Sequence, residues 1–126
     1  KSSAGMDLRA YLDTILIMRP LDRAMVKTGL YIQMPFGVEA QVRPRSGLAI
    51  KNGVTVLNSP GTIDSDYRGE ICVIVINLSN EDFEIKNGDR IAQLVFTKHE
   101  FVDLEVTDSL EKSARGESGF GSTGTK

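Results

Sequence analysis

Short runs of Val, Ile and Leu recur along most of the chain, and Gly, Pro, Asn or Asp separates them. Runs of this length and spacing are typical of β-strands joined by turns. The predicted strands cover residues 6–10, 14–18, 25–34, 38–43, 54–57, 71–78, 83–86, 90–98 and 104–106. The pattern therefore predicts an all-β fold, either a sandwich or a barrel.

Two segments differ from the other predicted strands. Residues 72–76 (CVIVI) are apolar without alternation, which predicts a strand buried on both faces. Residues 46–51 are the one segment with a helical pattern, because Ser46 can cap a single turn that Asn52 and Gly53 then end. The expected fold thus contains one short helical turn.

The end of the chain has a different composition. At 126 residues, the chain is long enough for one domain with its own core. From about Ser109 the apolar pattern stops, and the remaining residues are rich in Gly and Ser. Termini of this composition rarely form part of a core. We therefore expect a β-barrel domain over residues 1–112 and a flexible C-terminal arm over residues 113–126.

Charge and composition argue against several classes of protein. The net charge of −2 disfavours a nucleic-acid binder, because such proteins carry a basic surplus. No run approaches the roughly 20 apolar residues that a membrane-spanning helix needs. The single cysteine, Cys72, cannot form an intrachain disulfide, which suits a reducing compartment. We expect a cytoplasmic protein with no nucleic-acid or membrane partner.

Residues 60–70 (PGTIDSDYRGE) form the most informative stretch. They place charged side chains and the ring of Tyr67 in a turn between two apolar runs. Such a hairpin holds acidic groups on a rigid frame, where they can face a ligand. A plain turn also needs Gly, Pro, Asp and Ser, so a polar hairpin loop is the alternative. From the residues alone, Asp64 and Asp66 rank equally as functional acids.

Two further segments are candidate anion sites. Residues 43–49 (RPRSGLA) combine arginines, the Ser46 hydroxyl and the free N–H groups of a helix start. An ordinary Ser cap with solvated arginines is the alternative. Residues 115–124 (RGESGFGSTG) have the glycine spacing of a phosphate-binding P-loop but lack its lysine. Their glycines can still let N–H groups close on phosphates, whereas the alternative is a disordered linker.

Five motifs occur together and in order along the chain: residues 4–8 (AGMDL), 44–49 (PRSGLA), 61–69 (GTIDSDYRG), 88–94 (GDRIAQL) and 115–124. In order and spacing, this set closely resembles the trimeric deoxyuridine triphosphatases (dUTPases, dUTP pyrophosphatases). The resemblance implies a β jelly-roll subunit and a homotrimer with active sites at subunit interfaces. It also implies Mg²⁺-assisted hydrolysis of dUTP to dUMP and pyrophosphate, which keeps uracil out of DNA and supplies dUMP for dTMP synthesis.

The resemblance assigns roles to the hairpin. Asp64 resembles the catalytic carboxylate that positions and activates the water attacking the α-phosphorus. Asn58 resembles the amide residue that reads the uracil edge, together with backbone near Thr62, Ile63 and Cys72. Tyr67 resembles the ring that lies against the deoxyribose.

It assigns the phosphates and the lid to other segments. The phosphate-contacting set comprises Arg45, Ser46, Gly47 and Gln93, while Asp7 resembles a carboxylate near the water shell of the metal. The arm is expected to close over a site formed largely by other subunits. Its substrate-binding residues are Arg115 on the triphosphate, Phe120 as a lid over uracil, Ser122 and Thr123 beside the terminal phosphate, and Gly121.

Other interpretations remain open. A dCTP deaminase of the same superfamily would activate water at the pyrimidine ring instead of at phosphorus. A non-catalytic nucleotide-sensing module would keep the pocket without turnover. We expect Arg68 and Arg90 to be salt-bridged structural residues. Ser118 stands where the tail motif commonly has glycine, which would be strained if that position needs a positive φ.

Overall fold

The all-β expectation is confirmed. A computed structural model describes residues 2–120, 122 and 123. Within them the elements are β1 (Gly5–Arg9), β2 (Leu16–Met18), β3 (Arg23–Lys27), β4 (Val38–Arg43), α1 (Ser46–Asn52), β5 (Val54–Val56), β6 (Gly61–Ile63), β7 (Cys72–Asn77), β8 (Phe83–Ile85) and β9 (Arg90–Lys98).

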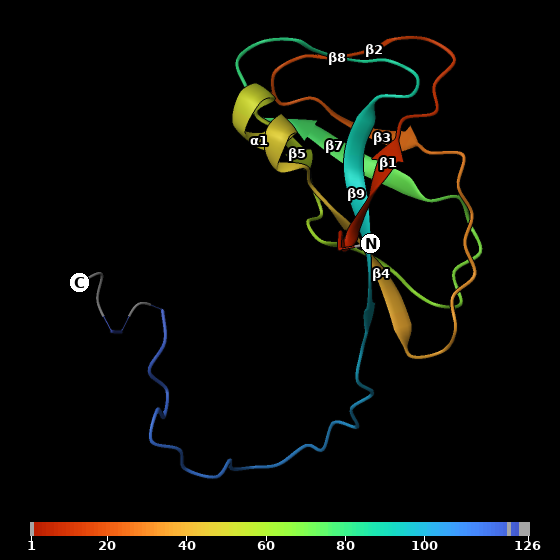
Figure 1. The fold of residues 1–126 in the computed structure, drawn as a ribbon. Helices are drawn as coiled ribbons and strands as arrows, with labels where there is room; N and C mark the ends of the chain where they lie inside the picture. Colours follow the sequence, from red (N-terminus) through yellow and green to blue (C-terminus); the bar gives the residue numbers. More distant parts are fainter. Residues whose placement is uncertain (1, 121, 124–126) are drawn as a thin grey trace.

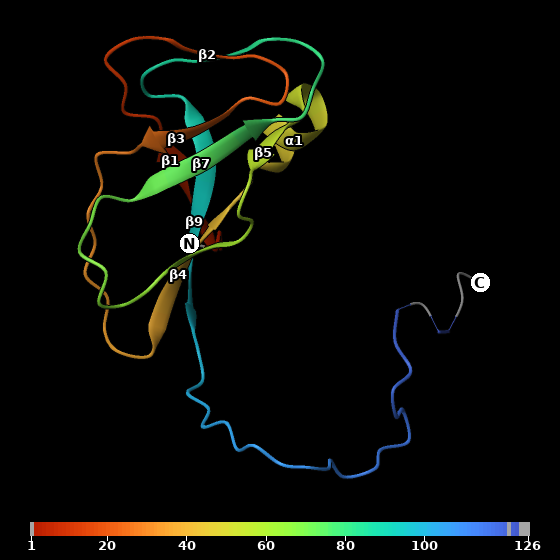
Figure 2. The same cartoon turned by 180° about the vertical axis from the view of Figure 1, so that it is seen from behind.

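The strands form two sheets and a separate pair. One sheet has the order β1-β9-β4-β6, the second has the order β3-β7-β5, and β2 pairs with β8. Every pairing is antiparallel. Figures 1 and 2 show β3 and β7 in a layer that crosses β9, with the β2–β8 pair closing one end of the body.

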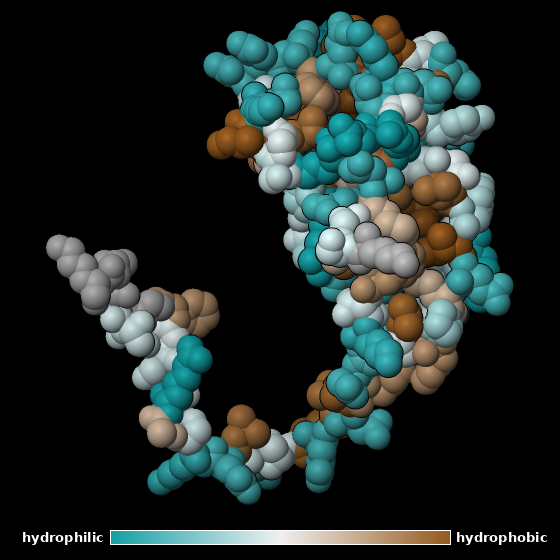
Figure 3. Space-filling view, in the orientation of Figure 1, coloured by the Kyte–Doolittle hydropathy of each residue, from teal (hydrophilic) through white to brown (hydrophobic). Residues whose placement is uncertain are grey.

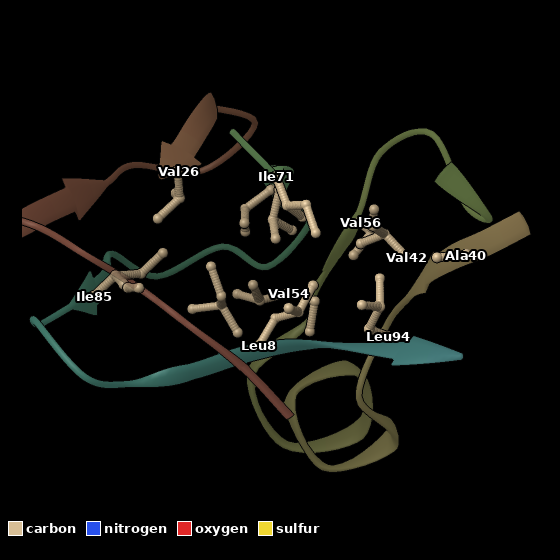
Figure 4. Packing of buried hydrophobic residues seen from close by; sticks show 14 of the residues in the cluster. Leu8, Val26, Ala40, Val42, Val54, Val56, Ile71, Ile85 and Leu94 are labelled. Carbon is tan, nitrogen blue, oxygen red and sulfur yellow. The ribbon is translucent and has the colours of Figure 1, made fainter. Parts of the chain in front are cut away.

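The core lies between the two sheets. Side chains of β4 and β9, such as Val42 and Leu94, face those of β5, namely Val54 and Val56 (Figure 4). Each of these four side chains is at most 3% exposed. Burial of one such aliphatic side chain contributes about 1.5–3 kcal/mol, so alternate positions on each strand hold the layers together.

The expectation of a strand buried on both faces over residues 72–76 is wrong. Val73 and Val75 point into the core, whereas Cys72, Ile74 and Ile76 are only partly buried. β7 is the central strand of a three-stranded sheet, and only one face of that sheet packs on the other layer. The apolar outer face is therefore free to line a cavity or to meet another subunit.

Other local expectations are corrected by long-range pairing. The predicted strand over 25–34 ends at Lys27, which pairs with Cys72, the first residue of β7. Residues 61–63, expected to belong to a turn, form β6 because they pair with β4. Residues 104–106, expected to form a strand, do not, because they pair with no other strand in the described chain.

The expected helical turn is confirmed as α1, and Gly53 ends it with a φ of 63°. The expected cap is wrong. Arg45 occupies the N-cap position with extended backbone, and it makes no side-chain capping hydrogen bond. Ser46 is instead the first helical residue, and its side chain is exposed.

The chain after β9 runs away from the body in an open arc (Figures 1 and 2). Phe101 stacks on Phe36 with ring centroids 4.7 Å apart, at the point where the chain leaves the body. Residues 101–118 are all exposed, and apolar side chains lie open along the arc (Figure 3). The boundary at residues 112 and 113 stays a prediction. Among the described residues, no helix is long and apolar enough to cross a membrane.

Candidate active site

The hairpin between β6 and β7 is held by its own hydrogen bonds. The Tyr67 N–H donates to the Asp64 carbonyl at 3.1 Å, which closes the turn. Arg68 Nη1 donates to the carbonyls of Ser65 and Tyr67 at 2.8 and 2.9 Å. Arg68 thus supports the turn through backbone carbonyls. The expectation that it forms a salt bridge is not met within the described residues.

A cavity of about 500 Å³ opens beside this hairpin. Its lining includes all six predicted residues of the hairpin region: Asn58, Thr62, Ile63, Asp64, Tyr67 and Cys72. The lining is completed by four residues that are not among the predicted site residues: Met25, Lys27, Glu70 and Ile74. Lys27 comes from a distant strand and carries no local signal, whereas Glu70 ends the most informative stretch and could have been chosen there.

The cavity separates the two acids that the residues alone ranked equally. Asp64 lines the cavity, and Asp66 is not part of its wall. Within the described residues, the Asp64 carboxylate is exposed and takes part in no ion pair or side-chain hydrogen bond. Its oxygens are therefore available to a water molecule or a ligand.

The side chains of Asn58 and Tyr67 each lie close to backbone atoms of a neighbouring residue. A Cβ added to Gly61 would lie 3.2 Å from Asn58 Nδ2, so glycine leaves room for the amide beside β6. Tyr67 Oη donates a hydrogen bond to the Glu70 carbonyl at 3.1 Å. Both side chains therefore have fixed neighbours at the cavity wall.

Charged neighbours surround Cys72. Burial raises the pKa of the Cys72 thiol, the Glu70 carboxylate raises that pKa further, and Lys27 opposes the rise. Glu70 is itself held in place: it accepts a hydrogen bond from the Gly29 N–H at 2.8 Å, and Lys27 Nζ lies 3.9 Å from its other oxygen. The thiol therefore stays neutral, as expected of an unreactive residue.

A second cavity, of about 280 Å³, gathers the predicted phosphate residues. Its lining consists of Ser3, Gly5, Asp7, Arg45, Ser46, Gly47 and Gln93. Strand register brings three of the motifs together here, because Gln93 of β9 lies opposite Asp7 of β1 and Arg43 of β4. Arg45 lies two residues after the end of β4, and its side chain reaches the same edge.

An ion-pair network orients this edge. Arg45 Nε lies 3.1 Å from Asp7 Oδ1, and Arg90 Nη1 lies 3.3 Å from Asp7 Oδ2. Arg45 Nη1 also donates to the Arg90 carbonyl at 3.2 Å. Two cations against one carboxylate leave the edge locally positive in a chain of net charge −2. The expectation of a salt-bridged Arg90 is confirmed.

The arm residues lie outside both cavities. Arg115 Nε donates to the Ser118 carbonyl at 2.8 Å, and the Phe120 ring is fully exposed. Ser122 and Thr123 line neither cavity, and Gly121 lies outside the described residues. Ser118 has no positive φ, so its backbone is unstrained in this arrangement; Phe120 has one, at 49°.

A model of the dUTPase family matches residues 1–124, nearly the whole chain. The chain belongs to the dUTPase family. The family resemblance drawn from the five motifs is thereby confirmed. Relatives named deoxyuridine 5'-triphosphate nucleotidohydrolase include one from Treponema denticola, 56% identical, with 97% of this chain and 85% of that protein covered. Another, from Cytophaga hutchinsonii, is 57% identical, with coverages of 97% and 79%.

Solved structures of dUTPases share the fold. A mutant dUTPase of Staphylococcus bacteriophage 80alpha with dUpNHpp is 26% identical and has a TM-score of 0.88; the match covers 99% of this chain and 88% of that one. The jelly-roll-like fold is confirmed by this similarity. At 22% identity and a TM-score of 0.78, a mutant dUTPase of phage phi11 of S. aureus, described with a structural Mg(II) ion, supports the fold alone.

Proposed function

We propose that this dUTPase-family chain hydrolyses dUTP to dUMP and pyrophosphate, with water attacking the α-phosphorus. One observation carries the proposal: an unpartnered carboxylate, Asp64, shares a cavity wall with the amide of Asn58 and the ring of Tyr67. The carboxylate can act on the attacking water, the amide can hydrogen-bond to the nucleobase, and the aromatic ring can pack against the sugar of a nucleotide. The names of the relatives agree with this chemistry.

Asp64 acts as the general base. Its exposed oxygens accept a hydrogen bond from the attacking water and take its proton as the oxygen–phosphorus bond forms. The bond to the departing pyrophosphate breaks on the opposite side of the phosphorus, so the carboxylate also fixes the line of attack. The turn bonds around Asp64 keep this direction constant.

The same cavity selects the nucleoside. The Asn58 amide can donate and accept at once, so in a fixed orientation it contributes to recognising the edge of uracil over that of cytosine. Exclusion of thymine requires backbone near Thr62, Ile63 and Cys72 to lie too close to the base for its 5-methyl group. The Tyr67 ring lies against the deoxyribose and leaves no space for a 2′-hydroxyl.

The second cavity holds the phosphates. Arg45 supplies a fixed cation, since Asp7 and the Arg90 carbonyl both orient its guanidinium. Ser46 and Gly47 add a hydroxyl and backbone N–H groups, and both are exposed to the cavity. Gln93, whose Nε2 donates to the Pro44 carbonyl at 3.0 Å, presents the rest of its amide. Such preorganised donors favour the charge that develops on the phosphates.

The donor set fits a Mg²⁺ ion carried by the substrate. Among the described residues, no three His, Cys, Asp or Glu side chains gather into a metal cage. Mg²⁺ is commonly bound through substrate phosphates, waters and one or two carboxylates. Both Asp7 oxygens already meet arginines, yet each carboxylate oxygen has a second lone pair for a metal-bound water. When bound, the ion would neutralise charge on the phosphates.

A homotrimer would complete the site. Apolar side chains remain open on the outer face of the β3–β7 sheet, where Met25 is 69% exposed. Val102, Leu104 and Val106 alternate with polar residues and pair with no strand of the described chain. Both features suit burial against a second copy. The arm, which leaves its own cavities open, would then bring Arg115, Phe120, Gly121, Ser122 and Thr123 to a neighbour's site.

Two alternative functions can be distinguished by experiment. A dCTP deaminase would release ammonia from dCTP, and a nucleotide sensor would bind dUTP without cleaving it. Neither is favoured, because the family model and the named relatives point to dUTP hydrolysis. The lone Cys72, free and unpaired, is also compatible with the cytoplasm as its location.

Pyrophosphate release from dUTP, dTTP, dCTP and UTP, with and without Mg²⁺, tests the function. We expect appreciable release from dUTP only. Asp64→Asn should lower turnover about 10²- to 10⁴-fold while leaving substrate binding largely intact. Asp66→Asn is the matched control, because Asp66 lies in the same turn but not on the cavity wall, and it should retain activity. Full turnover in Asp64→Asn would remove that residue from the mechanism.

A further inference from the structure

The Tyr67 ring folds back over the turn that carries it. Its Oη meets the Glu70 carbonyl at 3.1 Å, and its ring lies against the Cα of Gly69. A methyl group on Gly69 would overlap the ring carbons Cζ and Cε2 and the phenol oxygen. Tyr67 can therefore hold this pose only if residue 69 has no side chain.

The backbone does not demand a glycine at this position. Gly29, Gly37, Gly53 and Gly88 have positive φ angles that other residues adopt with strain, whereas Gly69 does not. An alanine at position 69 would therefore meet no strain from a positive φ. The three atoms nearest to a Cβ added at Gly69 all belong to Tyr67, so the glycine makes room for the ring.

Glu70 anchors the same unit to the second sheet. Its side chain is 17% exposed, and its carboxylate bonds to the Gly29 N–H at 2.8 Å and pairs with Lys27 at 3.9 Å. The carbonyl of the same residue holds the Tyr67 hydroxyl. The position of the ring is thus tied to the chain that follows β3, and not only to its own turn.

We infer that Gly69 and Glu70 are positioning residues that fix the Tyr67 ring as a wall beside the ribose 2′ position and so set the preference for deoxyribonucleotides over ribonucleotides. The inference rests on the proposed function, in which Tyr67 lies against the sugar. A pocket that can relax around an extra hydroxyl rejects it by only about 10²-fold, so strong rejection needs a wall that cannot retreat.

The decisive experiment measures the dissociation constants of dUMP and UMP by calorimetry on the full chain. In Gly69→Ala the added methyl displaces the ring, and the preference for dUMP should fall about tenfold. In a Tyr67→Ala background the same substitution should leave the preference unchanged, because no ring remains to be moved. An unchanged preference in Gly69→Ala, or an equal fall in both backgrounds, would overturn the inference.

The Tyr67→Phe variant provides a second test of the inference, which is available even if the Gly69→Ala variant does not fold. It keeps the ring and removes only the hydroxyl that Glu70 holds, and the preference should fall about fivefold, as expected for one lost hydrogen bond. A phenylalanine variant with the full preference would contradict the anchoring by the Glu70 carbonyl and overturn the inference.

Two substitutions of Glu70 test whether its hydrogen bond to the Gly29 N–H or its negative charge positions the Tyr67 ring. Glu70→Ala should lower the preference about fivefold, and Glu70→Gln should restore most of it, because a glutamine oxygen still accepts from the Gly29 N–H. Glu84→Ala is the matched control: Glu84 also pairs with a lysine, Lys86, at 3.6 Å, but lies on β8 away from this cavity. Equal preferences in Glu70→Ala and Glu84→Ala would overturn the role of Glu70.

Neither monophosphate is cleaved, so these ratios do not depend on turnover. Failure to release pyrophosphate from dUTP would overturn the proposed function and still leave the binding ratios to decide this inference.

Discussion

Asp7 and Arg45 form an ion pair across two sequence motifs, with the carboxylate Oδ1 3.1 Å from the guanidinium Nε. They are 38 positions apart in the chain, and the pairing of β1 with β9 and of β9 with β4 brings them together. The pair is only half-buried, so its contribution to folding stability is about 0–1 kcal/mol. Its importance lies in holding a cation at the edge of the phosphate cavity.

Asp7→Asn should impair catalysis more than stability. The substitution leaves two arginines beside a neutral amide, so Arg45 loses its fixed direction and any metal-bound water loses an acceptor. We expect kcat/KM for dUTP to fall about tenfold or more, in line with the loss of a well-oriented charged contact. Steady-state kinetics check this. Asp13→Asn, at an exposed position without an ion pair, is the control; equal kinetics in both variants would contradict the prediction.

Gly5→Ala should act through Gln93. A Cβ on Gly5 would overlap the side-chain amide of Gln93, which would have to move and give up its 3.0 Å bond to the Pro44 carbonyl. A flexible side chain can move at little cost, so the melting temperature should change little. The KM for dUTP should rise several-fold, about as much as in Gln93→Ala. If Gly5→Ala raises KM further in a Gln93→Ala background, Gly5 acts by another route.

Asn77→Ala should destabilise the fold by about 3 kcal/mol. The side chain is fully buried; its Nδ2 donates to the carbonyls of Met18 and Glu81 at 3.0 and 2.7 Å. Its Oδ1 accepts from the N–H and hydroxyl of Ser79. Removal leaves the buried Met18 carbonyl without this donor and the part-buried Ser79 N–H without its acceptor, each at a cost of about 1–3 kcal/mol. Urea denaturation measures the loss, and Asn80→Ala, at an exposed neighbouring position, should stay within about 0.5 kcal/mol.

Alkylation of Cys72 should require a higher pH than that of an ordinary thiol. Burial first, and then the Glu70 carboxylate, raise the pKa of the thiol, and the thiolate is the reacting form. Glu70→Gln should lower the pH midpoint of alkylation, and Lys27→Met should raise it, since Lys27 opposes the shift. Because the folded chain favours the neutral thiol, this residue adds stability below the ordinary thiol pKa and loses it as the pH rises.

The same experiment reports on the neighbours that face Cys72. Iodoacetamide labelling of the single cysteine, followed by mass spectrometry across a pH series, gives the midpoint for each variant. An unchanged midpoint in Glu70→Gln would show that the carboxylate does not act on the thiol.

Removal of all residues after Ser113 should abolish most activity without unfolding the body. The arm residues Arg115 and Phe120 line neither cavity of their own chain, and the buried core ends with β9. The melting temperature should stay close to that of the full chain, while kcat/KM for dUTP should fall by about 10²-fold or more. A full rate in the truncated chain would make the arm a linker.

Elements whose signals are local could be predicted from the amino-acid sequence alone. The strands over 38–43 and 90–98 have the predicted bounds, because each alternates or clusters apolar residues between clear turn signals. The helical turn after Arg45 was likewise predicted, since Gly53 ends it. The five motifs together indicated the family without any knowledge of contacts, because their order and spacing can be seen directly along the chain.

Which of these local signals form an element or a site depends on contacts between distant parts of the chain. β6 forms because β4 lies beside it, whereas residues 104–106 have the pattern of a strand and no partner. Asp64 is distinguished from Asp66 by the cavity that it lines. Backbone hydrogen bonds and cavity walls join residues far apart in the chain, and their partners are fixed by sheet register, which no short window of sequence contains.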